Sequence, residues 1–205
     1  PWLWSTGATS YDINNDNGIK ALTLVKDLVD AGSMSKEVIN WTQGDVMNQF
    51  ISGNIAMMVN GPWQVPTMRE QAPDLNWDVT LLPKDAEYAS CLGGENFGVI
   101  DGDNVDAALD FLQFATSKDE VASYIDDFGY IAARKDVAEG QFTDDETMQK
   151  FTEEMQYAQP RGPHAQWPEI SDALSLAVNE SITGTSAPAD AAAKAQSTID
   201  GILAE

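Results

Sequence analysis

The chain has 205 residues and is strongly acidic, with 33 Asp and Glu against 11 Lys and Arg and a net charge of −22. Such a surface repels phosphate groups, which argues against nucleic-acid binding and against attachment to anionic lipid. Hydrophobic residues make up 43% of the chain, a globular composition that excludes a disordered chain. No apolar run reaches the roughly 20 residues that a membrane span needs.

Apolar residues at helical spacing predict most of the secondary structure. Gly32 and Gly184 are expected to end two of the helices, and Ser186 is expected to cap the last one. Pro62 suits the first position of a helix because its missing N–H would be unpaired there in any case. We expect helices over 19–32, 45–52, 62–71, 105–115, 118–128, 144–156 and 170–184, and a final helix with Pro188 near its start.

Short apolar runs between these helices predict strands. Ile55 to Val59 is a compact apolar run between glycines, which is typical of a buried strand. Residues 76–82 and the segment after the Gly-rich turn at 93–98 are expected to be further strands, and 130–134 is expected to be extended. A helix-rich order with interposed strands indicates the α/β class.

Chemistry-bearing motifs are scarce. The chain has one histidine, His164, and one cysteine, Cys91, so a zinc site and an intrachain disulfide are not expected. No nucleophile elbow, phosphate-binding loop or dinucleotide motif is present, and we expect no catalytic residues, metal or cofactor. Carboxylates are abundant, so a glycoside hydrolase with a pair of acidic residues stays open as an alternative.

Tryptophans in loops and at helix starts are the most informative pattern. An indole face offers rigid apolar area that suits the C–H face of a sugar ring, whose hydroxyls need planar polar partners. Packing in a core is the competing interpretation for each tryptophan. The expected ligand-binding residues are Trp2, Trp4, Trp63, Gly94, Glu95, Asn96, Arg161, His164 and Trp167.

Three segments resemble one family. The segment FISGNIAMMVNGPW, the turn GGENFGVI and the ending ITGTSAPADAAAKAQSTIDGIL are similar to motifs of extracellular solute-binding proteins of the maltose-binding type. These proteins are the capture subunits of ABC sugar importers. The resemblance runs over essentially the whole chain, in the family's order, and the three motifs together make it specific.

The resemblance implies a periplasmic-binding-protein-like fold of type II, with two lobes that close over the ligand by hinge bending. Family members are about twice as long, so the chain is similar to their C-terminal half. Residues 1–95 are then expected to be the first part of the C-terminal lobe, 96–144 a remnant of the N-terminal lobe, and 145–205 the closing helices of the C-terminal lobe.

The resemblance also implies a function. The chain is expected to bind a carbohydrate, an oligosaccharide in the first instance, and to deliver it to ABC permease subunits without chemical change. Trp63 is expected to stack on the sugar. The whole protein is expected to be an extracellular or periplasmic monomer, anchored as a lipoprotein through a residue upstream of Pro1, whereas the fragment can self-associate. A peptide, polyamine or metal cargo on the same fold stays open.

Overall fold

The structure is a computed structural model that describes residues 1–204, and it divides into two compact units. The first unit contains 1–42, 82–92 and the chain from Tyr157 onward, and the second contains 43–81 and 93–156. Each unit is therefore built from segments that are far apart in the sequence. This grouping follows contacts within the chain, and the assignment of 1–95, 96–144 and 145–205 to lobes of a larger protein stays a prediction.

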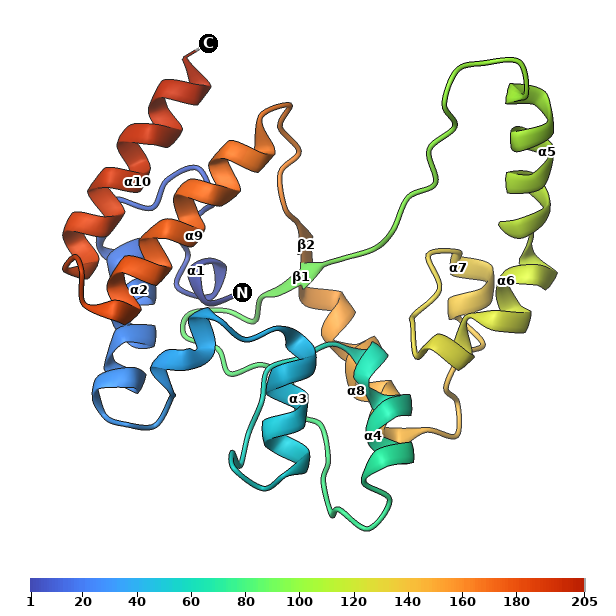
Figure 1. Cartoon of the computed structure of the whole chain (residues 1–205), viewed down its shortest axis with the longest axis horizontal. Coiled ribbons are helices and arrows are strands. Elements are labelled where there is room, and N and C mark those ends of the chain that lie inside the picture. Colours follow the sequence, from blue (N-terminus) through green and yellow to red (C-terminus); the bar gives the residue numbers. More distant parts are fainter. Residues whose placement is uncertain (205) are drawn as a thin grey trace. The chain divides into compact units, whose positions relative to one another are not determined.

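Three helices form the core of the first unit: α2 (Asp16–Asp30), α9 (Trp167–Thr183) and α10 (Pro188–Leu203). Figure 1 shows α9 and α10 running side by side, with α2 packed against them. Ile170 and Ile199 are fully buried, and small alanines on α9 and α10 let the two helices approach closely. The remaining elements of this unit are α1 (Trp2–Ser5), η1 (Lys36–Ile39), β1 (Ser90–Leu92) and β2 (Ala158–Pro160).

The ends of these helices follow local chemistry. The Asn15 side chain accepts a hydrogen bond from the Gly18 N–H at 3.0 Å and so caps α2. Gly184 follows α9 with φ of 76°, the left-handed conformation predicted for it. The prediction for Ser186 was wrong, because the N-cap of α10 is Ala187. The Ser186 hydroxyl instead donates to the Glu180 carboxylate at 3.0 Å.

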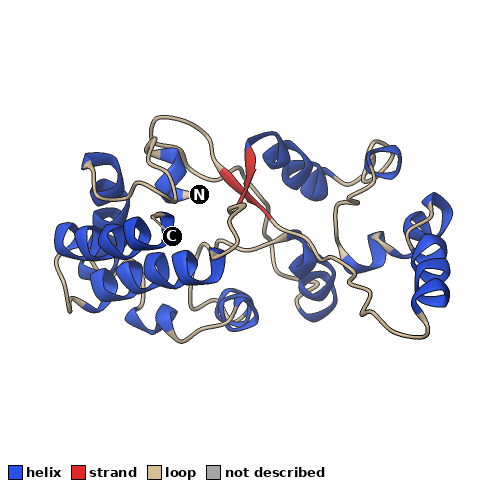
Figure 2. Cartoon of the chain, turned by 90° about the horizontal axis from the view of Figure 1, so that it is seen from above, coloured by secondary structure: helices blue, strands red, loops and turns tan. Residues whose placement is uncertain are grey.

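A single two-stranded ladder is present among the described residues. Strands β1 and β2 pair in parallel, with Ser90 opposite Ala158 and Leu92 opposite Pro160. Figure 2 shows these two short strands against a chain that is otherwise helix and loop. Parallel pairing of segments so distant in sequence requires a long crossover, which the residues between them supply.

The second unit is helical, with a small core around Val121, Ala132 and Val137. Arg69 of one helix forms an ion pair with Asp145 at the start of another. No helix among residues 1–204 is long and apolar enough to cross a membrane. The elements of the second unit are α3 (Gln43–Ile51), η2 (Pro62–Gln64), α4 (Val65–Gln71), α5 (Val105–Ala115), α6 (Lys118–Tyr124), η3 (Asp126–Phe128), α7 (Lys135–Ala138), α8 (Glu146–Glu154) and η4 (Met155–Tyr157). The boundary between the two units lies within η4.

The strands predicted in this unit were wrong. Residues 55–59, 76–82 and 98–100 form no ladder, and 55–59 is not buried, since Met57 is 86% and Val59 57% exposed. Ile100 is 91% exposed. A strand is defined by a regular ladder of backbone hydrogen bonds to a neighbour, and none of these runs forms such a ladder among residues 1–204.

Candidate functional site

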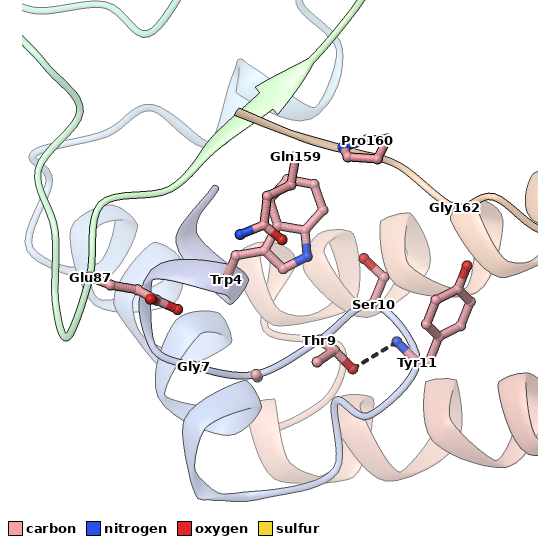
Figure 3. Close-up of a pocket in the computed structure, with 10 residues that line it drawn as sticks. Trp4, Gly7, Thr9, Ser10, Tyr11, Glu87, Gln159, Pro160 and Gly162 are labelled. Atoms are coloured by element: carbon pink, nitrogen blue, oxygen red, sulfur yellow. Dashed lines mark hydrogen bonds between the residues drawn. The ribbon is translucent and has the colours of Figure 1, made fainter. Parts of the chain in front are cut away.

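A pocket of about 310 Å³ opens in the first unit. Its volume is at the lower end of the range typical of small-molecule sites. Figure 3 shows residues from three separate segments of the chain, 4–11, 87 and 159–162, meeting around it. The lining residues are Trp4, Gly7, Ala8, Thr9, Ser10, Tyr11, Glu87, Gln159, Pro160 and Gly162.

Trp4 forms one wall of the pocket from the short helix α1. The helix is a single turn, closed by hydrogen bonds from the Ser5 N–H to the Pro1 carbonyl at 2.8 Å and from the Gly7 N–H to the Trp4 carbonyl at 2.9 Å. The indole is half-buried, so part of it faces the pocket. This side chain supplies the aromatic surface that sequence reasoning expected of it.

The floor of the pocket is the loop from Thr9 to Tyr11, and it is held in two ways. Within the loop, the Thr9 hydroxyl accepts hydrogen bonds from the N–H groups of Tyr11 at 3.3 Å and Asp12 at 3.1 Å (Figure 3). From α10, the Gln196 amide donates to the Tyr11 carbonyl at 2.9 Å and accepts from the Ile13 N–H at 2.8 Å. The loop is thereby fixed to the core of the unit.

Ser5 positions the opposite wall. It is 4% exposed. Its hydroxyl donates to the Glu87 carbonyl at 2.8 Å and accepts from the Asp85 N–H at 2.7 Å. The Ser5 carbonyl accepts from the N–H groups of Ala86 at 2.9 Å and Glu87 at 3.2 Å. Four hydrogen bonds thus hold residues 85–87 against α1 and bring Glu87 to the pocket.

The third wall comes from β2 and the loop that follows it. Gln159 and Pro160 line the pocket from the strand, and Gly162 continues this wall. Gly162 has φ of 86°, and a Cβ there would lie 3.1 Å from the backbone nitrogen of His164 and 3.6 Å from the Trp167 indole. Glycine is therefore needed both for the backbone conformation and for the close approach of these groups.

Electrostatically, the pocket is simple. Glu87 is the only Asp, Glu, Lys, Arg or His among its lining residues. The carboxyl groups with a lowered pKa lie outside the pocket. Arg134 lowers the pKa of Asp136, Arg69 lowers that of Asp145, and Lys194 lowers that of Glu180. A pair of acidic residues, as retaining and inverting glycosidases use, is not present in the lining.

Three of the predicted site residues lie near this pocket without being part of its lining. Arg161 is exposed, between two lining residues in the sequence. His164 and Trp167 pack against the Tyr11 ring, with centroid distances of 6.4 and 6.5 Å. Trp167 also packs against the core of α9 and α10. Trp2 lies in α1, two positions before Trp4, and is not among the lining residues.

The other predicted site residues belong to the second unit. Gly94, Glu95 and Asn96 are exposed and lie outside helices and strands. Trp63 sits in η2, half-buried, with its ring centroid 6.1 Å from that of Tyr130. A ligand role for each of these residues stays a prediction.

The geometry around Trp63 explains the Asn-Gly-Pro sequence before it. A Cβ on Gly61 would overlap the six-membered ring of the Trp63 indole, so the ring folds back over the glycine. Pro62 occupies the first position of η2, as predicted. Gly129 is buried with φ of 66°, and its own Cβ would lie 2.9 Å from the Pro62 carbonyl oxygen. Because Gly61 and Gly129 carry no side chain, residues 62–63 can pack closely against both of them, and this packing orients the Trp63 indole.

Sequence reasoning missed Tyr11, Glu87 and Gln159. They lie in three separate segments, and none belongs to a motif with a known spacing. No local signal marks them: the nearest predicted site residue is seven positions away in the sequence for Tyr11 and Glu87, and two for Gln159. Only folding of the chain brings them together.

Comparison with known proteins identifies the class. The model of the bacterial extracellular solute-binding protein family matches residues 2–150. The chain therefore belongs to this family. The fold is that of ABC-transporter solute-binding proteins, so the predicted α/β, periplasmic-binding-protein-like type II class is confirmed.

Individual relatives agree with this assignment. A solute-binding protein of an ABC transporter from Thermotoga lettingae TMO, bound with alpha-D-tagatose, superposes with a TM-score of 0.84 and 25% identity over 98% of this chain and 55% of its own. The maltose-bound MalE3 of T. maritima gives a TM-score of 0.84 at 22% identity over 98% and 56%. A Brucella abortus (strain 2308) chain with the name "Putative binding protein" is 27% identical over 94% of this chain and 50% of its own. The chain thus spans about half the length of the curated relatives it matches.

Proposed function

We propose that this chain is part of a sugar-binding subunit of an ABC importer, and that the pocket beside Trp4 contacts the sugar. The observation that carries the proposal is the pocket lining: one indole face, a tyrosine, two hydroxyls, an amide and one carboxylate. An aromatic face packs on the C–H face of a sugar ring, and the polar groups bind its hydroxyl rim. The tagatose-bound relative supports a sugar as the cargo.

The proposed mechanism is non-covalent capture. The sugar binds, the two lobes of the whole protein close around it, and the closed form docks on the membrane permease. Hinge closure of this kind needs only that the closed state bind the sugar better than the open state. As a member of an extracellular family the protein acts outside the cytoplasm. We further propose that a lipid anchor holds it at the membrane, which metabolic lipid labelling in cells would test.

The test is a binding screen with the chain and its Trp4→Ala variant. Tagatose, glucose, maltose and longer oligosaccharides are titrated, and binding is followed by calorimetry and thermal shift. Loss of the indole face is expected to weaken sugar binding roughly tenfold or more, because stacking on an aromatic side chain is worth about 1–3 kcal/mol. Binding of a peptide, polyamine or metal ion with no response to any sugar would overturn the proposal.

A further inference from the structure

The charge of the pocket rests on one side chain. Glu87 is the only formally charged residue in the lining, and no lysine, arginine or histidine faces it there. Figure 3 shows the Glu87 carboxylate on the same side of the pocket as Trp4 and Gly7. A ligand in this space therefore meets a negative charge that no cation of the lining neutralises.

The backbone around Glu87 is fixed, while its carboxylate is not engaged by the protein. Both backbone groups of Glu87 bond to the buried Ser5, the N–H at 3.2 Å and the carbonyl at 2.8 Å. No hydrogen bond or ion pair of the described residues uses its side-chain oxygens. Glu87 is exposed, and with its backbone fixed and no bond from the described residues its carboxylate is available to a ligand in the pocket.

Two lysines that contact the segment around Glu87 are already engaged by other groups. Lys20 pairs with the Asp85 carboxylate at 2.7 Å. The Lys84 ammonium lies over the Tyr88 ring, 4.5 Å from its centroid. Arg161 is exposed beside the lining residues Pro160 and Gly162, and it forms no ion pair with a described residue. It is therefore the group to control for in any test of charge.

We propose that Glu87 is a specificity-determining residue that makes the pocket reject anionic sugars and favour sugars that carry a protonated amine over neutral ones. The proposal rests on the proposed function. A sugar acid would bring a second negative charge next to the carboxylate, and like charges in one site repel. An amino sugar would place its ammonium against the carboxylate and within reach of the Trp4 face, and both contacts favour it. Neutral sugars bind by their hydroxyl groups donating to the same oxygens.

Three sugars of one size separate these effects: D-glucosamine, D-glucose and D-glucuronate. At about pH 6 the amine of glucosamine is protonated and the carboxyl group of glucuronate is ionised. Calorimetric or saturation-transfer titration of the chain is expected to rank them in that order, with about tenfold between the first and the last. In Glu87→Gln the ratio between the affinities for glucosamine and glucuronate is expected to shrink to about threefold or less. The amide keeps an oxygen acceptor of the same size, so glucose binding is expected to change least.

Two variants make the test specific. Glu169→Gln removes the same charge from an exposed position of α9 that does not line the pocket, and it is expected to leave the ranking unchanged. Arg161→Gln removes the exposed cation beside the wall, and a loss of the ranking in this variant as large as in Glu87→Gln would overturn the role of Glu87. About 1 M salt should reduce the ratio between the affinities for glucosamine and glucuronate in the unmodified chain. At that salt concentration the field of a charge near the surface is screened within a few ångströms.

The outcomes separate the two proposals. If sugars bind but Glu87→Gln keeps the full ranking, or if Glu169→Gln abolishes it equally, the role of Glu87 is overturned while the sugar-binding function stands. If glucuronate binds best, the role of Glu87 is overturned as well. If none of the three sugars and no member of the wider panel binds, the proposed function itself fails, and the role of Glu87 fails with it.

Discussion

Trp63 and Trp167 are both half-buried, yet their surroundings predict different roles. Trp167 packs against the core of α9 and α10 and against Tyr11. Trp63 lies over a glycine and beside one aromatic ring. We expect Trp167→Ala to lower the free energy of unfolding by about 2–3 kcal/mol, somewhat less than the loss of a fully buried aromatic side chain. Chemical denaturation of Trp167→Ala and of Trp63→Ala measures the change in the free energy of unfolding.

For Trp63→Ala we expect the reverse pattern. Sugar affinity of the whole protein should fall roughly ten- to hundredfold, because a stacking face is worth about 1–3 kcal/mol, with little change in melting temperature. Gly61→Ala is the matched control, since a methyl group there displaces the indole without removing it. A large loss of stability in Trp63→Ala with intact affinity would show that this tryptophan is a core residue.

At the scale of elements, replacing Gly18 in α2 by alanine is expected to have two opposing effects on stability. Alanine is the better helix former by about 1 kcal/mol, but a Cβ here would overlap the carbonyl oxygen of Ile13, which is backbone and cannot move aside. Overpacking costs about 1–3 kcal/mol, so we expect the clash to prevail and Gly18→Ala to lower the melting temperature.

Gly201 in α10 provides the control for this substitution. No atom lies within 4 Å of its added Cβ, so Gly201→Ala is expected to keep the helix-propensity gain of up to about 0.5–1 kcal/mol. Thermal unfolding of the two variants side by side gives opposite signs if the argument is correct. Stabilisation by both substitutions would mean that α2 has room to shift away from Ile13.

The ion pair between α4 and the start of α8 predicts a pH dependence. Arg69 forms two hydrogen bonds with the Asp145 carboxylate, at 2.7 and 2.8 Å, and these lower the pKa of Asp145. Because the folded pKa lies below the unfolded one, the stabilisation is complete above about pH 4 and is lost as the pH falls through the lowered value. With Arg69 49% exposed, screening limits the effect at pH 7 to about 0.5–1 kcal/mol.

Asp145→Asn isolates this charge, because asparagine can still accept the Met148 N–H at the start of α8. Urea unfolding is expected to show a deficit near neutral pH that disappears at about pH 3. Asp136→Asn serves as the comparison, since its partner Arg134 is two residues away and both are exposed. A deficit in Asp145→Asn that persists in acid would point to a lost cap and not to a lost ion pair.

Helices were largely predictable from the sequence and strands were not, for a physical reason. The bounds of α5 were predicted to the residue, because apolar spacing and local hydrogen bonds define a helix on their own. Residues 55–59 have an equally clear pattern, but a strand depends on a neighbour elsewhere in the chain. The three-residue strands β1 and β2 carry no pattern and were missed.

The candidate site was predictable to the same limited degree. Trp4 was identified because an aromatic residue beside turn residues is visible locally. Glu87 was not, since nothing in its own segment shows that Ser5, distant in sequence, holds it at the pocket. Contacts of long sequence separation carry the site, and a single sequence does not display them.

For the whole molecule, the exposed apolar surface of α5 has a measurable consequence. Leu109, Phe111 and Phe114 are 44%, 61% and 59% exposed, and no residue of this helix is buried. Phe111 and Phe114 are three residues apart and so are neighbours on the helix surface, and an exposed aromatic pair of this kind is unusual on a soluble monomer. We expect the chain to bind a hydrophobic dye, and Phe111→Ser with Phe114→Ser to reduce the fluorescence without lowering the melting temperature.

The same double substitution distinguishes surface from core. If dye binding is unchanged, the dye reports a different region of the chain. If the melting temperature falls by several degrees, the two phenylalanines pack within the chain in solution. Leu24→Ser, on the exposed side of α2, is the control for a change in surface hydrophobicity alone.

The Gln196 amide determines when, during synthesis of the chain, the pocket can be completed. It binds the backbone of Tyr11 across 185 residues of sequence. At about 5–20 residues per second, a ribosome needs roughly 10–40 s to travel from one residue to the other. During that interval the loop from Thr9 to Tyr11 is already synthesised but lacks its bond to α10, so the pocket is completed only after residue 196 has been made.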